Sequence, residues 1–201
     1  MSQRNSGYAR KERDLYETPE WVTEMLVPHI PERVECIWEP AAGSGKMARA
    51  LGGAIVVHQT DVHAMPNLHD VIDFLSDDAC IGDRADAIIT NPPYEHAEQF
   101  IDVALSYMER RIGFVSMLLR TDYDHAKTRA RLFELHPAFA KKIVLTKRIR
   151  WFDGGSSPSF NHAWFIWDWA HRGAPTIAYA PSQQRPVQTE LNDYLQGELT
   201  S

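Results

Sequence analysis

Long apolar runs and cysteine are both scarce in this sequence of 201 residues. No run of about 18 apolar residues occurs, so we expect no membrane-spanning helix. Residues 1–13 are polar and basic with no apolar segment behind them, which argues against a secretory signal. Only two cysteines are present, Cys36 and Cys80, and each lies in or beside an apolar stretch. We therefore expect two buried thiols in a reducing cytoplasm.

Two common nucleotide-binding patterns are incomplete in the glycine-rich segment 39–45 (EPAAGSG). A phosphate-binding P-loop would need a glycine at position 40 and Ser or Thr after the lysine, where Pro40 and Met47 stand. A dinucleotide fingerprint would need a glycine three residues past Gly45, and Ala48 leaves that fit incomplete. The segment therefore argues against ATP and NAD as ligands.

The charge is acidic overall but unevenly distributed, with a net value of −6. Between Arg120 and Arg150 there are nine Lys or Arg and three acids, a local charge of +6 that leaves −12 for the rest of the chain. A basic region on an acidic body can contact phosphates while the remainder stays soluble. A solvated helix face followed by a charged loop would give the same pattern, so charge alone does not decide between the two.

Hydrophobic patterning predicts strands that alternate with helices. Helices are expected at residues 18–29, with Thr18 as the N-cap, and at residues 46–51, 97–108 and 124–135. Strands are expected at residues 35–39, 54–60, 69–73, 86–90, 112–119, 143–145 and 163–167. This order predicts a mainly parallel, doubly wound α/β sheet in a domain of residues 14–180, between a basic tail (1–13) and a polar tail (181–201). Ligands of such sheets bind at the carboxyl ends of the strands.

The glycine turn, residues 39–45, lies between the first expected strand and a helix. Its glycines allow a sharp turn and a close approach to a ligand at a helix N-terminus. Glu39 begins the turn, and an acid there suits a ligand that has no phosphate but carries a cationic amino-acid group. Asp61 ends the second strand, where it can accept hydrogen bonds from a ribose diol, although a helix-capping or loop carboxylate is the structural alternative.

Residues 91–94 read Asn-Pro-Pro-Tyr and follow a buried strand. Pro92 and Pro93 fix the backbone and remove two N–H donors, so that carbonyls dominate the local surface. The amino nitrogen of adenine is a poor nucleophile because its lone pair is delocalised into the ring. Accepting both its hydrogens, on the Asn91 side-chain oxygen and the Pro92 carbonyl, would favour a pyramidal nitrogen whose lone pair can attack. Tyr94 would stack on a base flipped out of its helix, whereas a plain turn after a strand is the structural alternative.

Three segments in this order, residues 16–19 (YETP), 39–45 and 91–94, resemble the amino-group-methylating DNA methyltransferases. The similarity is to the adenine-specific enzymes of phage and restriction systems and covers about residues 14–168. It implies a Rossmann-like methyltransferase fold with an antiparallel late strand, S-adenosyl-L-methionine as the cofactor, and no metal. It also implies methyl transfer to the 6-amino group of adenine in DNA.

The resemblance further implies which residues contact the cofactor. The first segment would pack over its methionine part through Tyr16, Thr18 and Pro19. The glycine turn would form the floor of the pocket through Glu39, Pro40, Ala41, Gly43 and Gly45. Asp61 would hold the ribose, and the acid–aromatic pair Asp73 and Phe74 would contact the adenine of the cofactor.

Two features depart from the family. Members with their own sequence specificity usually carry a target-recognition domain, and none fits here, so specificity would come from short loops, from a partner protein, or be weak. The aromatic side chain that sandwiches the flipped base is not singled out: Trp151, Phe152 and Phe160 are candidates, with core packing as the alternative for each. Candidates for phosphate contacts in the same region are Lys147, Arg148 and Arg150.

Three other functions stay open. Adenine in RNA offers identical base chemistry, and the basic stretch does not separate it from DNA. The Asn-Pro-Pro-Tyr chemistry also serves amide nitrogens, so a protein-glutamine methyltransferase is a rival; that family usually has Asp in its glycine turn and a helical N-terminal domain. A catalytically idle cofactor-binding partner is the third, and the intact residues 91–94 argue against it.

Overall fold

The structure is a computed structural model that describes residues 16–52, 55–64, 70–81, 84–151 and 160–180. Its strands form one sheet in the order β3-β2-β1-β4-β5-β7-β6-β8. Their bounds are β1 Cys36–Glu39, β2 Val56–Asp61, β3 Asp70–Val71, β4 Ala87–Thr90, β5 Phe114–Arg120, β6 Phe139–Leu145, β7 His162–Asp168 and β8 Thr176–Ala180. All pairings are parallel except those of β7 with β5 and β6. The mainly parallel sheet with an antiparallel late strand is thus confirmed.

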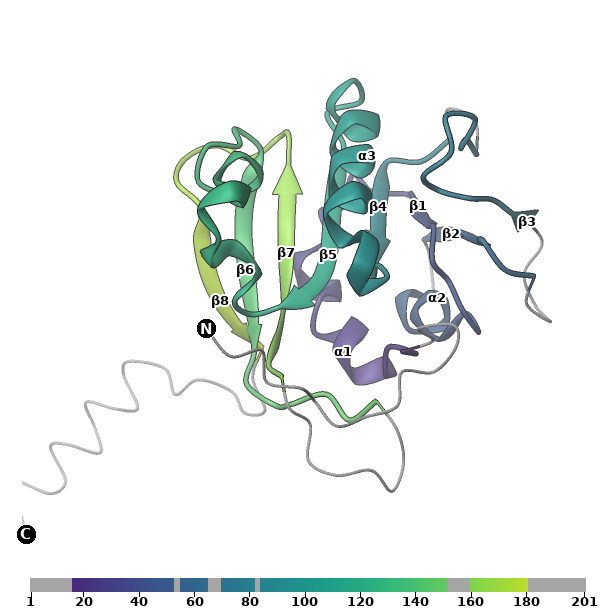
Figure 1. The fold of residues 1–201 in the computed structure, drawn as a ribbon, viewed down its shortest axis with the longest axis horizontal. Helices are drawn as coiled ribbons and strands as arrows, with labels where there is room; N and C mark the ends of the chain where they lie inside the picture. Colours follow the sequence, from purple (N-terminus) through teal and green to yellow (C-terminus); the bar gives the residue numbers. More distant parts are fainter. Residues whose placement is uncertain (1–15, 53–54, 65–69, 82–83, 152–159, 181–201) are drawn as a thin grey trace, which may run out of the picture.

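Two apolar layers cover the two faces of this sheet, because successive strand residues point to opposite faces. In Figure 1, α3 (Ala97–Glu109) crosses in front of β4 and β5. Its buried side chains recur at three- and four-residue spacing and pack with Trp38, Ile88 and Val115 in one cluster. On the other face, α1 (Glu20–Glu24) and α2 (Lys46–Leu51) pack against the neighbouring strand residues Ile37 and Ile89.

The first predicted helix is shorter than expected. It begins after Pro19, which occupies the N-cap position that was expected for Thr18, and it ends at Glu24. A separate 3₁₀ turn, η1 (Val27–His29), follows. Pro28 lies inside this turn, and it has no N–H with which to continue α-helical hydrogen bonding.

The predicted helix at residues 124–135 is wrong. Two 3₁₀ segments, η3 (Tyr123–His125) and η4 (Lys127–Leu132), flank an extended Ala126 (φ −82°, ψ 127°). The Arg129 guanidinium donates to the Tyr123 carbonyl at 2.6 Å, so a side chain satisfies the acceptor that an α-helix would have used.

Two further differences concern β8 and the cysteines. β8 was not expected, because only one of its five residues is buried and it shows little apolar periodicity. The thiols were expected to be buried, but Cys36 is half-buried at the start of β1 and Cys80 is exposed in the irregular segment before β4. The expected tails, residues 1–13 and 181–201, lie outside the described residues. Among the described helices, none has the length and apolar content needed to span a bilayer.

Replacing a central residue tests the two-layer core. Ile88→Ala removes a fully buried side chain from β4 and should lower the free energy of unfolding by about 2–5 kcal/mol in urea titration. Ile177→Ala makes the same change on β8, where the side chain is 65% exposed, and should change it by less than about 0.5 kcal/mol. Equal losses in the two variants would contradict this arrangement.

Candidate active site

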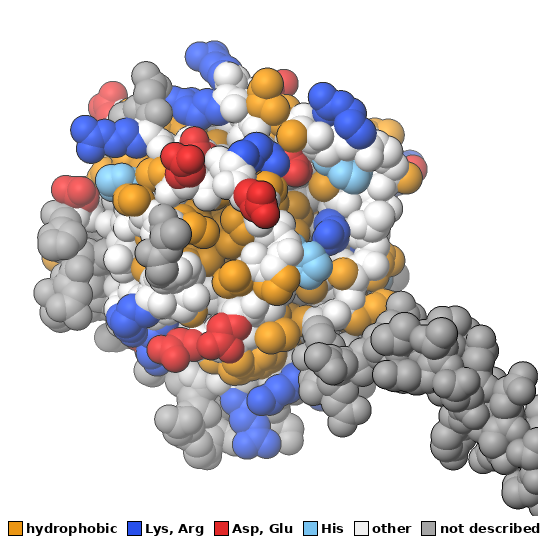
Figure 2. Space-filling view, turned by 180° about the vertical axis from the view of Figure 1, so that it is seen from behind, with side chains coloured by type: hydrophobic (Ala, Val, Ile, Leu, Met, Phe, Trp, Pro, Cys, Tyr) orange, Lys and Arg blue, Asp and Glu red, His pale blue; other side chains and the backbone are white. Residues whose placement is uncertain are grey.

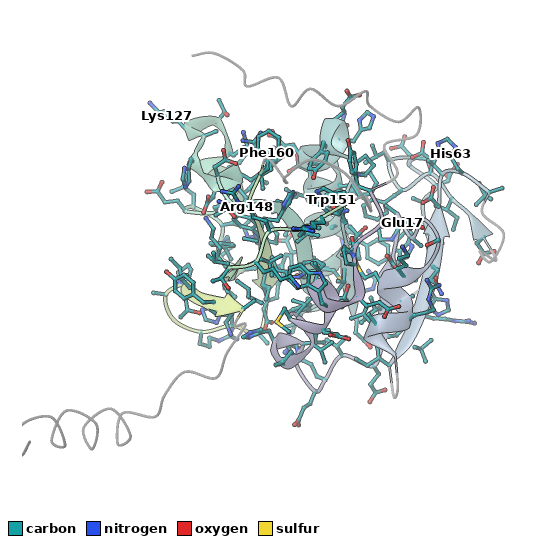
Figure 3. All side chains as sticks on the ribbon, turned by 90° about the horizontal axis from the view of Figure 1, so that it is seen from below. Glu17, His63, Lys127, Arg148, Trp151 and Phe160 are labelled. Atoms are coloured by element: carbon teal, nitrogen blue, oxygen red, sulfur yellow. The ribbon has the colours of Figure 1, made fainter. Side chains whose placement is uncertain are left out.

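A cavity of about 550 Å³ opens at the carboxyl ends of β1, β2 and β4. Figure 3 looks onto this edge of the sheet, with Glu17 and His63 toward one side and Arg148, Trp151 and Phe160 nearer the middle. Most of the residues expected to form a site line the cavity: Tyr16, Thr18, Glu39, Pro40, Ala41, Gly43, Asp61, Asp73, Phe74, Asn91, Pro92, Pro93 and Tyr94. Three motifs that lie far apart in the sequence therefore share one pocket.

The glycine turn curls around the end of β1. Gly43 and Gly45 both have positive φ, 52° and 75°, a region in which residues with a Cβ are strained. Gly45 donates its N–H to the Ala42 carbonyl at 2.8 Å and does not line the cavity. Its role is to shape the turn, because a side chain at its φ of 75° is strained whatever space surrounds it.

Asp61 is the acceptor that holds this turn. Its Oδ2 accepts the Gly43 N–H and its Oδ1 accepts the His63 N–H, each at 3.0 Å. A carboxylate has about four lone-pair positions, so both oxygens keep capacity for a ligand's hydroxyl groups. Asp61 is thus a loop-holding carboxylate that also lines the cavity, and its contact with a ribose stays a prediction.

Glu39 is a buried acid at the floor of the cavity. Its side chain is 2% exposed, and its Oε2 has no hydrogen-bond partner among the described residues. Burial raises the pKa of Glu39 well above 4.5, and the nearby negative charge of Asp61 adds to the rise, while a backbone hydrogen bond from Ala48 opposes it. A cationic group placed in the cavity would stabilise the ionised form.

The segment Tyr16–Thr18 forms a wall of the cavity and is tied to two other walls. Glu17 pairs with Lys46, the first residue of α2, at 2.6 Å, and the hydrogen bond from Lys46 lowers the pKa of Glu17. The Asn91 Nδ2 donates to the Tyr16 carbonyl at 3.0 Å. Because a carbonyl can only accept, this bond fixes which end of the Asn91 amide faces Tyr16 and turns Oδ1 away as an available acceptor.

Four rings meet beside the Asn-Pro-Pro-Tyr turn. The Tyr16 ring contacts those of Tyr94 and Trp151 edge-on, with both centroids at 5.6 Å. His162 lies 5.2 Å from the Trp151 ring and 6.4 Å from that of Tyr94. Phe160 is outside this cluster and lies under the Arg120 guanidinium at 4.1 Å. Phe152 lies outside the described residues.

The acid–aromatic pair after β3 divides into two roles. Phe74 is 1% exposed and packs edge-on against Trp38 with centroids at 5.0 Å, so it belongs to both the core and the cavity wall. Asp73 is exposed, and its Oδ1 accepts the Leu75 N–H at 2.9 Å.

Pro19 does not line the cavity, and several lining residues were missed: Glu17, Ala42, Ser44, Lys46, Met47, Val62, His63, Leu75, Glu95, His96 and Phe100. Glu17 and Lys46 each lie inside or directly after a recognised motif. Their opposite charges suggest an ion pair, but the sequence does not show that the two residues lie close together.

The basic region is not one continuous surface. Arg131 pairs with Glu98 and Asp102 beside α3, and Lys142 pairs with Asp124. On the reverse face, Figure 2 shows Lys and Arg interspersed with Asp and Glu rather than segregated. The loop after β6 carries three further cations: Lys147, whose Nζ lies 4.9 Å above the Trp21 ring, Arg148, which donates to Asn161, and the exposed Arg150.

No family model and no curated protein matches this sequence. Solved structures do. A type I restriction-modification methyltransferase subunit from Streptococcus thermophilus has a TM-score of 0.64 at 12% identity, over 92% of this chain and 53% of that chain. A putative class I S-adenosylmethionine-dependent methyltransferase from Listeria monocytogenes has a TM-score of 0.59 at 15% identity, over 89% and 68%. A dimethyladenosine transferase from Plasmodium falciparum has a TM-score of 0.52 at 14% identity, over 77% and 62%.

These likenesses define the fold. The chain has the Rossmann-like α/β fold of the class I S-adenosylmethionine-dependent methyltransferases, as expected. It spans about half the length of the Streptococcus thermophilus subunit.

The buried acid gives a test of the cavity that needs no ligand. Because the folded-state pKa of Glu39 is raised, ionising it costs stability, and the contribution of Glu39 to stability should fall as pH rises above about 4.5 toward the folded pKa. Glu39→Gln can still accept from the Ala48 N–H but cannot ionise. Its free energy of unfolding relative to wild type should therefore increase between about pH 4 and about pH 7.5, measured by urea titration. Glu24→Gln, on the exposed end of α1, should show no such trend.

Proposed function

We propose that this chain transfers a methyl group from S-adenosyl-L-methionine to the exocyclic 6-amino group of adenine in DNA. The observation that carries the proposal is the Asn91 amide, held by the Tyr16 carbonyl with its oxygen free to accept, beside a cavity whose floor is the buried acid Glu39. The turn that borders this cavity lacks the phosphate-binding spacing, which agrees with a cofactor that carries no phosphate.

The residues present fit this cofactor. Oε2 of Glu39, which has no hydrogen-bond partner among the described residues, would accept from the cationic amino group of the cofactor's methionine part. That positive charge would also lower the raised pKa of Glu39 and favour its ionised form. Asp61 would accept from the ribose hydroxyls while it keeps the Gly43 turn in place. Phe74 would offer an apolar wall to the adenine. When bound, the cofactor supplies an electrophilic methyl group on a sulfonium.

The chain's own contribution to transfer is positioning and polarisation. Asn91 Oδ1 and the Pro92 carbonyl would accept the two hydrogens of the target amine and hold its lone pair toward the methyl group. In that arrangement the amine would form the N–C bond as the methyl group leaves the sulfonium, and would then lose one hydrogen as a proton to water. Tyr94, 37% exposed at the rim of the cavity, would stack on the flipped base.

Trp151 is the candidate we favour for the second face of the base. It is half-buried and shares the contacts of the Tyr94 cluster through Tyr16 and His162. Phe160 already has one face covered by the guanidinium of Arg120. Lys147, Arg148 and Arg150 would contact the flanking phosphates, since all three lie in the segment that leads into Trp151.

DNA is the preferred target because the structural neighbours include type I restriction-modification methyltransferases. A partner protein that supplies sequence recognition is part of this proposal, because one neighbour is described in the context of complex assembly of the type I restriction-modification system. Adenine in RNA is the second candidate, since a dimethyladenosine transferase and a 23S rRNA methyltransferase share the fold.

Two substitutions should separate cofactor binding from transfer. Asp61→Ala should weaken binding of S-adenosyl-L-methionine by about 1–3 kcal/mol in calorimetry, because the ribose hydroxyls lose their acceptor.

Asn91→Ala should bind the cofactor nearly normally but lower turnover about 100-fold or more, since one positioned acceptor of this kind is worth about 2.7–4 kcal/mol. Turnover is measured on DNA, RNA and a protein extract. The proposal would be overturned if calorimetry showed tight binding of NAD and no heat of binding for S-adenosyl-L-methionine. Transfer of methyl groups to protein alone would overturn it as well.

The nucleic-acid contact is tested by salt dependence. Replacing Lys147, Arg148 and Arg150 together with Gln should weaken DNA binding without changing which sequence is modified, because phosphate contacts position while base contacts specify. The slope of log affinity against log salt should flatten by up to about three units. The matched control replaces Arg110, Arg111 and Arg172 with Gln, which makes the same charge change at the opposite edge of the sheet. An equal loss in this control would show that only net charge matters.

A further inference from the structure

The hydroxyl of Tyr94 meets a buried histidine. The hydroxyl oxygen lies 2.9 Å from Nε2 of His162, which is hydrogen-bond distance. His162 is 2% exposed and is the first residue of β7, where it pairs across the ladder with Arg120. The contact joins the turn after β4 to a strand 68 residues further along the chain.

His162 is held in its neutral form. Burial lowers its pKa to about 4, and the charge of Arg120 opposite adds to this, while Asp122 acts in the other direction. A neutral imidazole has one ring nitrogen that accepts a hydrogen bond. Nε2 can therefore accept the proton of the Tyr94 hydroxyl at neutral pH.

The position of the histidine is itself fixed by packing. The Trp151 ring lies edge-on to the imidazole at 82°, and the backbone of His162 is anchored in the antiparallel pairing of β5 with β7. Tyr94, by contrast, lies at the start of the short segment η2 (Tyr94–His96) and is partly exposed. The Tyr94 hydroxyl is thus held by a residue of a paired strand, whereas the Tyr94 backbone belongs to a connecting segment.

We propose that His162 is a positioning residue for the target base: it anchors the hydroxyl of Tyr94, so that the face of this ring is presented at the cavity before the base enters. The inference rests on the proposed function and adds to it the group that orients the stacking ring. Fixing the ring in advance reduces the entropy lost when the base stacks on it. Loss of the anchor should therefore raise KM for DNA more than it lowers kcat, with cofactor affinity unchanged.

The test is a double-mutant cycle in methyl transfer to DNA. Tyr94→Phe and His162→Leu should each lower kcat/KM by about 2–10-fold, the size of one net hydrogen bond, and the double variant should be no worse than the more impaired single variant. His162→Gln places an acceptor near the position of Nε2 and should restore most of the loss. Multiplicative losses in the double variant, or a Gln variant as impaired as the Leu variant, would overturn the inference.

Matched controls make the same chemical changes elsewhere. Tyr107→Phe removes a hydroxyl from a half-buried ring that packs on Trp38, and His136→Gln replaces a half-buried histidine beside Trp169. Both should keep wild-type kcat/KM. An equal loss in either one would show that general loosening, and not the anchor, explains the effect.

A measurement without substrate separates this inference from the proposed function. The imidazole NMR signals of His162 should shift in Tyr94→Phe and stay unchanged in Tyr107→Phe. Unchanged His162 signals in Tyr94→Phe overturn the anchoring contact and leave the proposed function standing. A wild-type protein that shows this shift but transfers no methyl group to DNA overturns the proposed function, and the positioning role with it.

Discussion

One carboxylate at the end of β2 holds the candidate site together. Asp61 accepts from the backbone of the glycine turn after β1 and from its own loop, and the Thr60 carbonyl beside it accepts the Ala42 N–H. These bonds are possible because β1 pairs in parallel with both β2 and β4, which brings three carboxyl ends to one edge. The rest of the cavity is built around this edge, including the buried Glu39 and the turn that begins at Asn91.

Polar contacts couple the walls of the cavity, in addition to the edge-on packing of Tyr16 against Tyr94 and Trp151. The segment Tyr16–Thr18 is tied to α2 through Glu17 and Lys46, and to the Asn-Pro-Pro-Tyr turn through Asn91. Tyr94 is tied in turn to β7 through His162. These contacts join segments that lie far apart in the sequence.

Sequence patterning located the core better than it located the connections. The 97–108 helix follows from apolar periodicity and most of the predicted strands from short apolar runs, and each occurs with shifted ends. The predicted 124–135 helix does not form, because Ala126 is extended and the Arg129 side chain donates to the Tyr123 carbonyl. Apolar periodicity does not report such contacts. β8 was missed because an edge strand with one buried residue carries almost no apolar pattern. The basic region looked continuous in sequence, yet acids from other elements pair with much of it.

By itself the sequence determined the order of the motifs and the kinds of group they bring: a glycine turn with an acid, a carboxylate after β2, and an amide followed by two prolines. Spacing along the chain was enough for this, because the strand order of a doubly wound sheet places such ends together. Only the tertiary structure decided that Nδ2 of Asn91 faces Tyr16, that Oε2 of Glu39 has no described partner, and that a histidine from β7 meets the Tyr94 hydroxyl. Hydrogen-bond direction and burial depend on which distant segments come into contact, and one sequence read alone does not report those contacts.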